Sequence, residues 1–459
     1  MSLEFFASPH NIDPEFRIFL ESACNQLCDW LATSGEEGPL PESFTLPQVS
    51  PEINGLSREE LLDDLKILMK GAYRPSHPGA LGHLDPPALT SSIVGDLICA
   101  GINNNLLAEE LSPSLSILER KLCSWFATRI GLPDGSGGVA ASGGTLSNLM
   151  ALVIARQHAE LHTNSNAVLL ASDDAHVSLE KALSVMGLSN ESLQKVDTDK
   201  NGMMSLDALY ISLERIRSQG KKCFAVVATA GTTLRGAVDP IFEISKICKQ
   251  ENIWLHVDGA IGGVFSLSQK TSKLVKGISL ADSISINPQK LLGIAKTSSL
   301  LIVSDRSKLS SAFSTGLPYT EPSSDCDEYH GGEIGIQGTR PAEALKLWMG
   351  LRQLGQKGLE QLLLESIERR EYLQSKIDIN KFNIISGPLH LLALSPKGLT
   401  KSKVNEWSIT TRKELLSKNF MLSRPIHNSI HYLKVVLGNP NTQLKDLDVL
   451  SELLNQSLC

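Results

Sequence analysis

Two ionisable side chains near the middle of the chain could together hold an electron-withdrawing ring. Lys290 follows the apolar segment SISINPQ, and Asp258 ends another apolar run, IWLHVD. A desolvated lysine amine loses its proton readily and can form an imine with an aldehyde. A carboxylate at the end of a buried strand needs a partner, and a protonated pyridine nitrogen would be one. The pair therefore suggests a covalently bound pyridine cofactor, although each residue alone is more often a solvated lysine or an ion-paired aspartate.

Two further features could serve the same ligand. The segment SGGTLSN (142–148) leads from glycines into an apolar-periodic helix, and a helix N-terminus holds phosphate well. Such a turn is more often a simple connection, and neither a GxGxxG fingerprint nor a P-loop occurs. His176, in LLASDDAHVSLEKA, could stack on a pyridine ring, or it could be an ordinary hydrogen-bonded histidine.

The elements that would position these residues alternate along the chain. Short apolar runs read as strands buried on both faces, and helical stretches lie between several of them. The runs are 167–172, 224–231, 253–260 and 299–304, and the clearest helices are 144–161 and 240–252. This alternation predicts an α/β fold with an open, mainly parallel sheet. Ligands of such sheets bind beyond the carboxyl ends of the strands.

The flanking segments have a different pattern. Residues 1–75 read as a helical N-terminal arm, in which 57–72 has helical periodicity and an acidic first turn. Residues 76–340 would form the large domain. Residues 341–459 would form a smaller α/β domain, with one long helix or two over 341–373 and strands near 383–394 and 430–437. We expect three regions on this basis.

Composition limits the classes of partner. The 459 residues carry 43 basic and 50 acidic side chains, so the formal charge is 43 − 50 = −7, which disfavours nucleic acid. No apolar run is long enough for a membrane span, and the first residues lack the pattern of a signal peptide. The eight cysteines are scattered, which favours a reducing cytoplasm. Two histidine pairs at helical spacing, His158/His162 and His427/His431, lack a zinc-site pattern, so we expect no metal.

An ordered series of motifs resembles the group II pyridoxal 5'-phosphate (PLP)-dependent amino-acid decarboxylases. This family includes aromatic-amino-acid, glutamate and diaminobutyrate decarboxylases. The resemblance spans about residues 77–348 and rests on eight segments. These are HPGALGHLDPP (77–87), LSPSLSILE (111–119), SGGTLSN (142–148), SDDAHVSLEKA (172–182), VVATAGTTLRGAVDP (226–240), HVDGA (256–260), NPQK (287–290) and GTRPAEALKLW (338–348).

The resemblance implies a PLP-dependent transferase fold of type I, with a seven-stranded sheet, and a homodimer with active sites at the subunit interface. It also implies roles for individual residues. Lys290 would hold the cofactor covalently, Asp258 would pair with the pyridine nitrogen, and His176 would stack on the ring and handle protons. The remaining roles fall to Gly144, Thr145 and Asn287 (phosphate), Thr232 and Ala260 (ring contacts), Arg340 (substrate carboxylate) and Tyr319, in a predicted lid over 312–332 (protonation of the product carbanion).

Three positions depart from the family pattern. Gln289 stands where histidine is usual, and it can still donate a hydrogen bond to phosphate but cannot carry charge. Gly259 replaces the usual alanine, and Ile261 stands where an aromatic residue is common. These departures bear mainly on the identity of the substrate.

The expected reaction converts an L-amino acid into its amine and carbon dioxide. Glu109 and Glu110 lie in LAEELSPS (107–114), where related enzymes line the pocket from the neighbouring subunit. An acidic wall there would favour a cationic substrate such as 2,4-diaminobutyrate. Both glutamates could equally face solvent, and an aromatic or acidic substrate stays open. Rival readings are a PLP-dependent aminotransferase or carbon–sulfur lyase of the same fold, and a catalytically silent homologue with a binding role. A nicotinamide dehydrogenase fits the sheet but lacks the fingerprint.

Overall fold

A seven-stranded sheet forms the centre of the computed structural model, which describes residues 5–51, 53–316, 320–321 and 329–458. Its order is β1-β7-β6-β5-β4-β2-β3. Only β7 runs antiparallel to its neighbours, so the expected mainly parallel α/β sheet is confirmed. The strands are β1 (Gly137–Ala141), β2 (Ala167–Ser172), β3 (Leu193–Val196), β4 (Lys222–Thr229), β5 (Trp254–Gly259), β6 (Ser283–Ile286) and β7 (Ser299–Val303).

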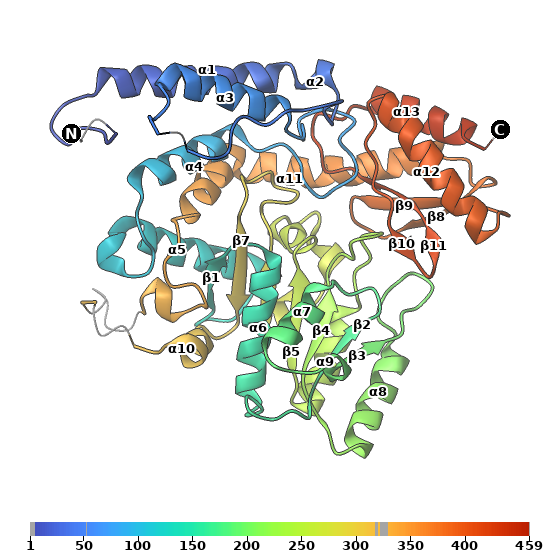
Figure 1. Cartoon of the computed structure of the whole chain (residues 1–459). Coiled ribbons are helices and arrows are strands. Elements are labelled where there is room, and N and C mark those ends of the chain that lie inside the picture. Colours follow the sequence, from blue (N-terminus) through green and yellow to red (C-terminus); the bar gives the residue numbers. More distant parts are fainter. Residues whose placement is uncertain (1–4, 52, 317–319, 322–328, 459) are drawn as a thin grey trace.

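Helices cover both faces of this sheet (Figure 1). Every residue of β2, β5, β6 and β7 is buried, as expected for strands between two helical layers. One apolar core contains side chains of α5, α8 and α9, and the other contains side chains of α6, α7 and α10. These helices are α5 (Pro113–Ile130), α6 (Gly144–His158), α7 (Ser178–Val185), α8 (Leu206–Ser218), α9 (Ile241–Glu251) and α10 (Ser307–Phe313). Short 3-10 turns are η1 (Glu109–Leu111), η2 (Asn190–Ser192), η3 (Gly263–Leu267), η4 (Ser272–Val275), η5 (Ile278–Leu280) and η6 (Gly331–Glu333).

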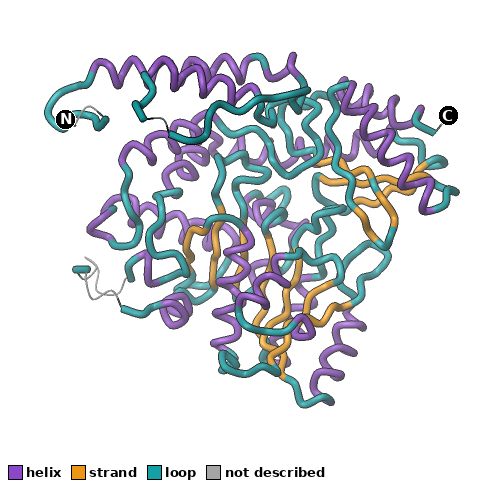
Figure 2. Tube along the Cα trace, in the orientation of Figure 1, coloured by secondary structure: helices purple, strands orange, loops and turns teal. Residues whose placement is uncertain are grey.

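A second, smaller sheet lies in the C-terminal part of the chain, apart from the first (Figure 2). It is antiparallel, with the order β12-β9-β8, and a separate hairpin joins β10 to β11. The long helix α11 contains one non-helical residue, Gly355, at φ 59°. The bounds are α11 (Ala344–Lys376), β8 (Phe382–Ser386), β9 (Leu391–Pro396), α12 (Lys401–Ser417), β10 (Ile426–His427), β11 (Ile430–His431), β12 (Leu433–Val436) and α13 (Leu444–Gln456).

The N-terminal segment is helical and lies along the outside of the molecule (Figure 1, blue). It contains α1 (Pro14–Ala32), α2 (Ser34–Glu37) and α3 (Arg58–Lys70), and α4 (Thr90–Ile102) follows. Ser57 and Glu60 cap α3 reciprocally, in hydrogen bonds of 3.2 and 2.7 Å. The division of the chain near residues 75 and 340 stays a prediction. Among the described residues, no helix combines the length and the apolar character needed to cross a membrane.

Candidate active site

One cavity at the carboxyl ends of five strands collects most of the predicted site residues. Its volume is about 270 Å³. The segments that line it follow or end β1, β2, β4, β5 and β6, which is where ligands of open α/β sheets bind. All eight predicted cofactor-binding residues are in its wall: Gly144, Thr145, His176, Thr232, Asp258, Ala260, Asn287 and Lys290.

Asp258 ends β5 and is held by three donors. Asn148 Nδ2 donates to its Oδ2 at 2.9 Å, and Ser285 Oγ and the Ala260 N–H donate to its Oδ1 at 3.2 Å each. Burial opposes a charge on this carboxyl group. The Lys290 ammonium, His256 and the hydrogen bonds outweigh burial, and they hold the pKa of Asp258 below its ordinary value. An ionised carboxylate in a buried site suits a cationic ring nitrogen.

Lys290 and His176 face the same cavity as Asp258. Burial lowers the pKa of Lys290, against the opposing effect of Asp258, so its amine becomes neutral at a lower pH than that of a free lysine. Burial also lowers the pKa of His176. The Ser178 N–H donates to Nδ1 of His176 at 3.2 Å, so in the neutral ring Nε2 carries the proton. The site therefore has an amine that loses its proton more readily than an ordinary lysine, and an imidazole whose neutral form is favoured.

The start of α6 and the turn after β6 form a cradle suited to phosphate. Gly143 has φ 103°, a left-handed value that glycine tolerates, and Gly144 begins the helix. The Asn287 amide bridges the two segments: its Oδ1 accepts from the Gly144 N–H at 3.2 Å, and its Nδ2 donates to Ser299 Oγ at 2.7 Å. A Cβ at position 144 would lie 2.9 Å from that amide. Glycine at 144 thus permits this close approach.

The other cavity residues have local partners. Thr232 Oγ1 accepts from the Ala237 N–H at 3.1 Å, which fixes the loop after β4. Gln289 Oε1 accepts from the Ser298 N–H at 2.6 Å. Its amide nitrogen is thus the end that could donate to phosphate, as the sequence suggested.

Of the predicted catalytic residues, Arg340 is not part of this cavity, and Tyr319 cannot be placed. Arg340 lies outside its lining, and its two terminal nitrogens donate to Glu119 at 2.6 Å each. Burial opposes its charge, but Glu119 raises the pKa of Arg340 above its ordinary value. Tyr319 lies outside the described residues, so its predicted role stays a prediction. Glu109 is buried and pairs with Arg120 at 3.0 Å, while Glu110 is exposed.

The sequence reasoning missed three groups that interact with site residues, of which Asn148 and His256 are buried and Lys434 is half-buried. Asn148 lies in the cavity wall and binds Asp258, and His256 binds Asn148 in turn. The alternation of His256 and Asp258 along one strand was the available signal. Lys434, on β12, is distant in sequence from every predicted motif. Burial and the charge of Lys290 lower the pKa of Lys434 to about 8.

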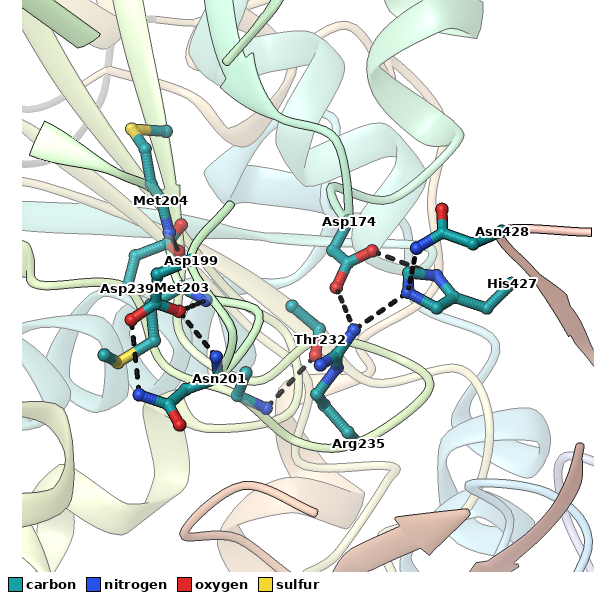
Figure 3. Close-up of polar contacts among 11 residues, drawn as sticks. Asp174, Asp199, Asn201, Met203, Met204, Thr232, Arg235, Asp239, His427 and Asn428 are labelled. Carbon is teal, nitrogen blue, oxygen red and sulfur yellow. Dashed lines mark hydrogen bonds and ion pairs between the residues drawn. The ribbon is translucent and has the colours of Figure 1, made fainter. Parts of the chain in front are cut away.

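A buried ion pair ties the cavity to the C-terminal hairpin (Figure 3). Asp174, which lines the cavity, pairs with Arg235 Nη2 at 3.0 Å and with His427 Nδ1 at 3.4 Å. Arg235 Nη2 also lies 3.0 Å from His427 Nε2, and Asn428 Nδ2 lies 3.2 Å from the same Nε2 atom. The ring of His427 is therefore held from two sides at the tip of the β10–β11 hairpin.

The donor set fits a phosphorylated pyridine aldehyde. The helix start at 143–145 and Asn287 could hold the phosphate, Asp258 the ring nitrogen, and Lys290 the aldehyde carbon. Among the described residues, no cluster of three or more histidine, cysteine or acidic side chains could hold a metal ion.

Comparison with known families identifies the family of this chain. The model described as "Pyridoxal-dependent decarboxylase conserved domain" matches residues 41–393. The chain belongs to this family. The cofactor and the type of enzyme expected from the sequence, a PLP-dependent amino-acid decarboxylase, are thereby confirmed, and the identity of the amino acid stays open.

Relatives within the pyridoxal-dependent decarboxylase family differ in the substrate they are named for. The aromatic-L-amino-acid decarboxylase of Bacillus atrophaeus is 29% identical over 88% of this chain and 85% of its own. The L-2,4-diaminobutyrate decarboxylase of Rhizobium meliloti (strain 1021) is 28% identical over 80% of this chain and 73% of its own. A solved structure of Oryza sativa TDC with PLP and tryptamine superposes with a TM-score of 0.90 at 20% identity, covering 98% of this chain and 99% of that one. At that identity the likeness shows the fold alone.

Proposed function

We propose that this decarboxylase acts on an L-amino acid with a cationic side chain, through a cofactor held by Lys290. The observation that carries the cofactor assignment is the placement of Lys290, Asp258 and His176 on one cavity of about 270 Å³. Pyridoxal phosphate, when bound, supplies the electron sink for the pair released as carbon dioxide departs.

The side chains of this chain would then divide the work. Lys290 would hold the cofactor covalently, and its lowered pKa favours the neutral amine that such a bond requires. Asp258 keeps a proton on the ring nitrogen because its own carboxyl group stays ionised. His176 presents Nε2–H toward the reacting face. We keep Tyr319 as the proposed donor of the proton to the product carbon.

The substrate carboxylate needs a cation, and two candidates are available. Arg340 is already bound by Glu119 through two hydrogen bonds, so it could clamp the substrate only if that pair opened. Lys434 is half-buried and its charge interacts with that of Lys290, although, like Arg340, it lies outside the cavity lining. We propose Lys434 for the carboxylate, with Arg340 as the alternative.

The preference for a cationic side chain rests on the acidic pair at 109–110. Pairing with Arg120 offsets the charge of Glu109. Glu110 is exposed, so it is the better candidate to reach the active site of a neighbouring subunit and bind the ammonium of a substrate there. The model substrate is 2,4-diaminobutyrate. Aromatic and acidic amino acids are the alternatives, and the departures at Gly259, Ile261 and Gln289 bear on this choice.

We also propose a homodimer in a reducing cytoplasm. The location rests on the scattered cysteines. The dimer is supported by apolar side chains of α4 that are exposed in the single chain, at fractions of 42 to 47%. These are Val94, Leu97, Ile98 and Ile102. Sedimentation of the purified protein at twice the mass of one chain would support this assignment, and a monomer at micromolar concentration would contradict it.

A substrate panel with two readouts tests the proposed function. The purified holoenzyme is given 2,4-diaminobutyrate, glutamate, an aromatic amino acid and an S-substituted cysteine, and carbon dioxide is measured together with amine, keto acid and thiol products. Carbon dioxide with the matching diamine is expected. Keto acid without carbon dioxide would indicate an aminotransferase. Thiol release from the S-substituted cysteine would indicate a carbon–sulfur lyase. A protein that binds PLP but turns over none of them would support a silent homologue, and a preference for glutamate would refute the cationic assignment.

A further inference from the structure

Five buried polar side chains form one hydrogen-bonded series that ends on the carboxylate of Asp258. The distances are 2.8 Å from Trp254 Nε1 to Ser283 Oγ, 2.9 Å from Ser283 Oγ to His256 Nδ1, 3.0 Å from His256 Nε2 to Asn148 Oδ1, and 2.9 Å from Asn148 Nδ2 to Asp258 Oδ2. His256 and Ser283 are 0% exposed, and Asn148 is 1% exposed. The series therefore lies in the interior, where unpaired polar groups are costly.

The chemistry of the two ends fixes the direction of every donor. The indole N–H of Trp254 can only donate, and an ionised Asp258 can only accept. Asn148 must turn its NH₂ toward Asp258, so its Oδ1 faces His256 and requires a proton on Nε2. His256 Nδ1 then accepts from the Ser283 hydroxyl. Each group donates toward Asp258, and aligned hydrogen bonds of this kind strengthen one another. Burial lowers the pKa of His256 to about 4, which agrees with the neutral ring that this pattern needs.

The sheet places these groups without help from loops. Trp254, His256 and Asp258 alternate along β5, so they share one face. In the adjacent strand β6, Ser283 pairs in register with His256, and Ser285 pairs with Asp258. Asn148 comes from α6, which packs on that face. The pattern therefore follows from strand register and helix position.

We propose that His256 is a positioning residue that acts through Asn148: it orients the Asn148 amide so that its NH₂, and not its oxygen, faces Asp258. This inference rests on the proposed role of Asp258 as the partner of the cofactor nitrogen. Without the Nε2–H donor, the Asn148 NH₂ keeps its acceptors, Asp258 Oδ2 and Ser178 Oγ at 2.9 Å each, but the amide oxygen loses its partner in the interior, so the amide is held from one side only. A reversed amide would put an oxygen against the carboxylate, weakening its charge and its hold on the cationic ring.

Binding of PLP to the apoprotein tests the proposal. His256→Phe removes the donor, and we expect the Kd for PLP to rise about tenfold, because the Asn148 NH₂ is then held less firmly against the charged Asp258. His256→Gln can donate from a similar position and should restore the Kd to within about threefold of wild type. The matched control is Val257→Ala, a neighbour buried on the opposite face of β5, which should lower Tm and leave the Kd unchanged.

A double-mutant cycle separates positioning from packing. If His256 acts through Asn148, adding His256→Phe to Asn148→Ala should change the Kd by less than about twofold. If the two substitutions raised the Kd for PLP independently, so that their factors multiplied in the double variant, the proposal would be overturned. A Kd for His256→Gln as high as that of His256→Phe would overturn it too.

A second measurement needs neither variants nor cofactor. Nitrogen NMR of histidine-labelled apoprotein at neutral pH should show a neutral His256 ring protonated at Nε2. A ring protonated at Nδ1 would overturn the proposal even if the variants fail to fold. Failure of wild-type protein to bind PLP would instead refute the proposed function and leave this result standing.

Discussion

Glu119 holds the guanidinium of Arg340 through two hydrogen bonds of 2.6 Å, and both side chains are 5% exposed. Removing one partner of such a pair strands a buried charge. Arg340→Met should therefore lower the free energy of unfolding by about 3–5 kcal/mol, and Glu119→Gln in the same chain should recover part of the loss. Urea denaturation of the wild type and of these two variants measures this. If Arg340→Met left stability intact but raised KM, the carboxylate role would return to Arg340.

Lys434 gives a pH dependence with a defined sign. Because burial and Lys290 lower the pKa of Lys434 to about 8, its ammonium is lost as pH rises through that value. If this ammonium binds the substrate carboxylate, kcat/KM should fall above about pH 8. Lys434→Arg should move this descending limb to higher pH, since a guanidinium stays charged. Lys434→Met should lower kcat/KM by about tenfold and abolish the limb. An unchanged pH profile in the Met variant would rule out this role.

Arg235 should control the stability of the C-terminal hairpin. It joins Asp174 to His427, and the side chains of Arg235 and Asp174 are 7% and 8% exposed. Arg235→Met leaves Asp174 buried without its cation, a change that costs about 3–5 kcal/mol in comparable pairs. Hydrogen exchange should become faster at β10–β11 and stay slow in β5. Equal acceleration in both segments would mean that the pair supports the whole fold rather than the hairpin.

Gly144 should matter for the cofactor because its added Cβ would lie 2.9 Å from the Asn287 amide. Gly144→Ala should displace that amide and raise the Kd for PLP about tenfold, as expected for about 1–3 kcal/mol of overpacking. Gly35→Ala is a matched control, since a Cβ at that glycine of the short helix α2 meets nothing within 4 Å. A Kd that Gly144→Ala leaves unaltered would exclude the cradle as the phosphate site.

The sequence predicts the site better where its residues lie in local motifs. Asp258 lies near the carboxyl end of the buried strand β5 and Lys290 follows the buried strand β6, so the topology of a parallel sheet alone brings them to one edge. His256 gave a weaker signal. Its position two residues before Asp258 puts both on one face of the strand, but on a strand buried on both faces this does not show whether the ring is hydrogen-bonded or only packed. Lys434 could not be found, because only the tertiary fold brings β12 near Lys290.

The fold shows the same limit. The runs at 167–172 and 299–304 predict strands that the structure confirms, but their apolar composition does not encode direction, and β7 proves antiparallel. The helical periodicity over 341–373 left open one helix or two. The structure shows helix from Ala344 to Lys376 with a break in backbone geometry at Gly355. Register and kinks depend on packing between distant segments, which periodicity does not record.

The most direct test reduces the holoprotein with borohydride and locates the attached cofactor by peptide mass spectrometry. The label should be on Lys290, and Lys290→Ala should carry none and release no carbon dioxide. Lys434, a half-buried lysine that also has a lowered pKa, is the internal comparison. A label on Lys434 or on any other lysine, or a Lys290→Ala protein that still turns over, would contradict the assignment of Lys290.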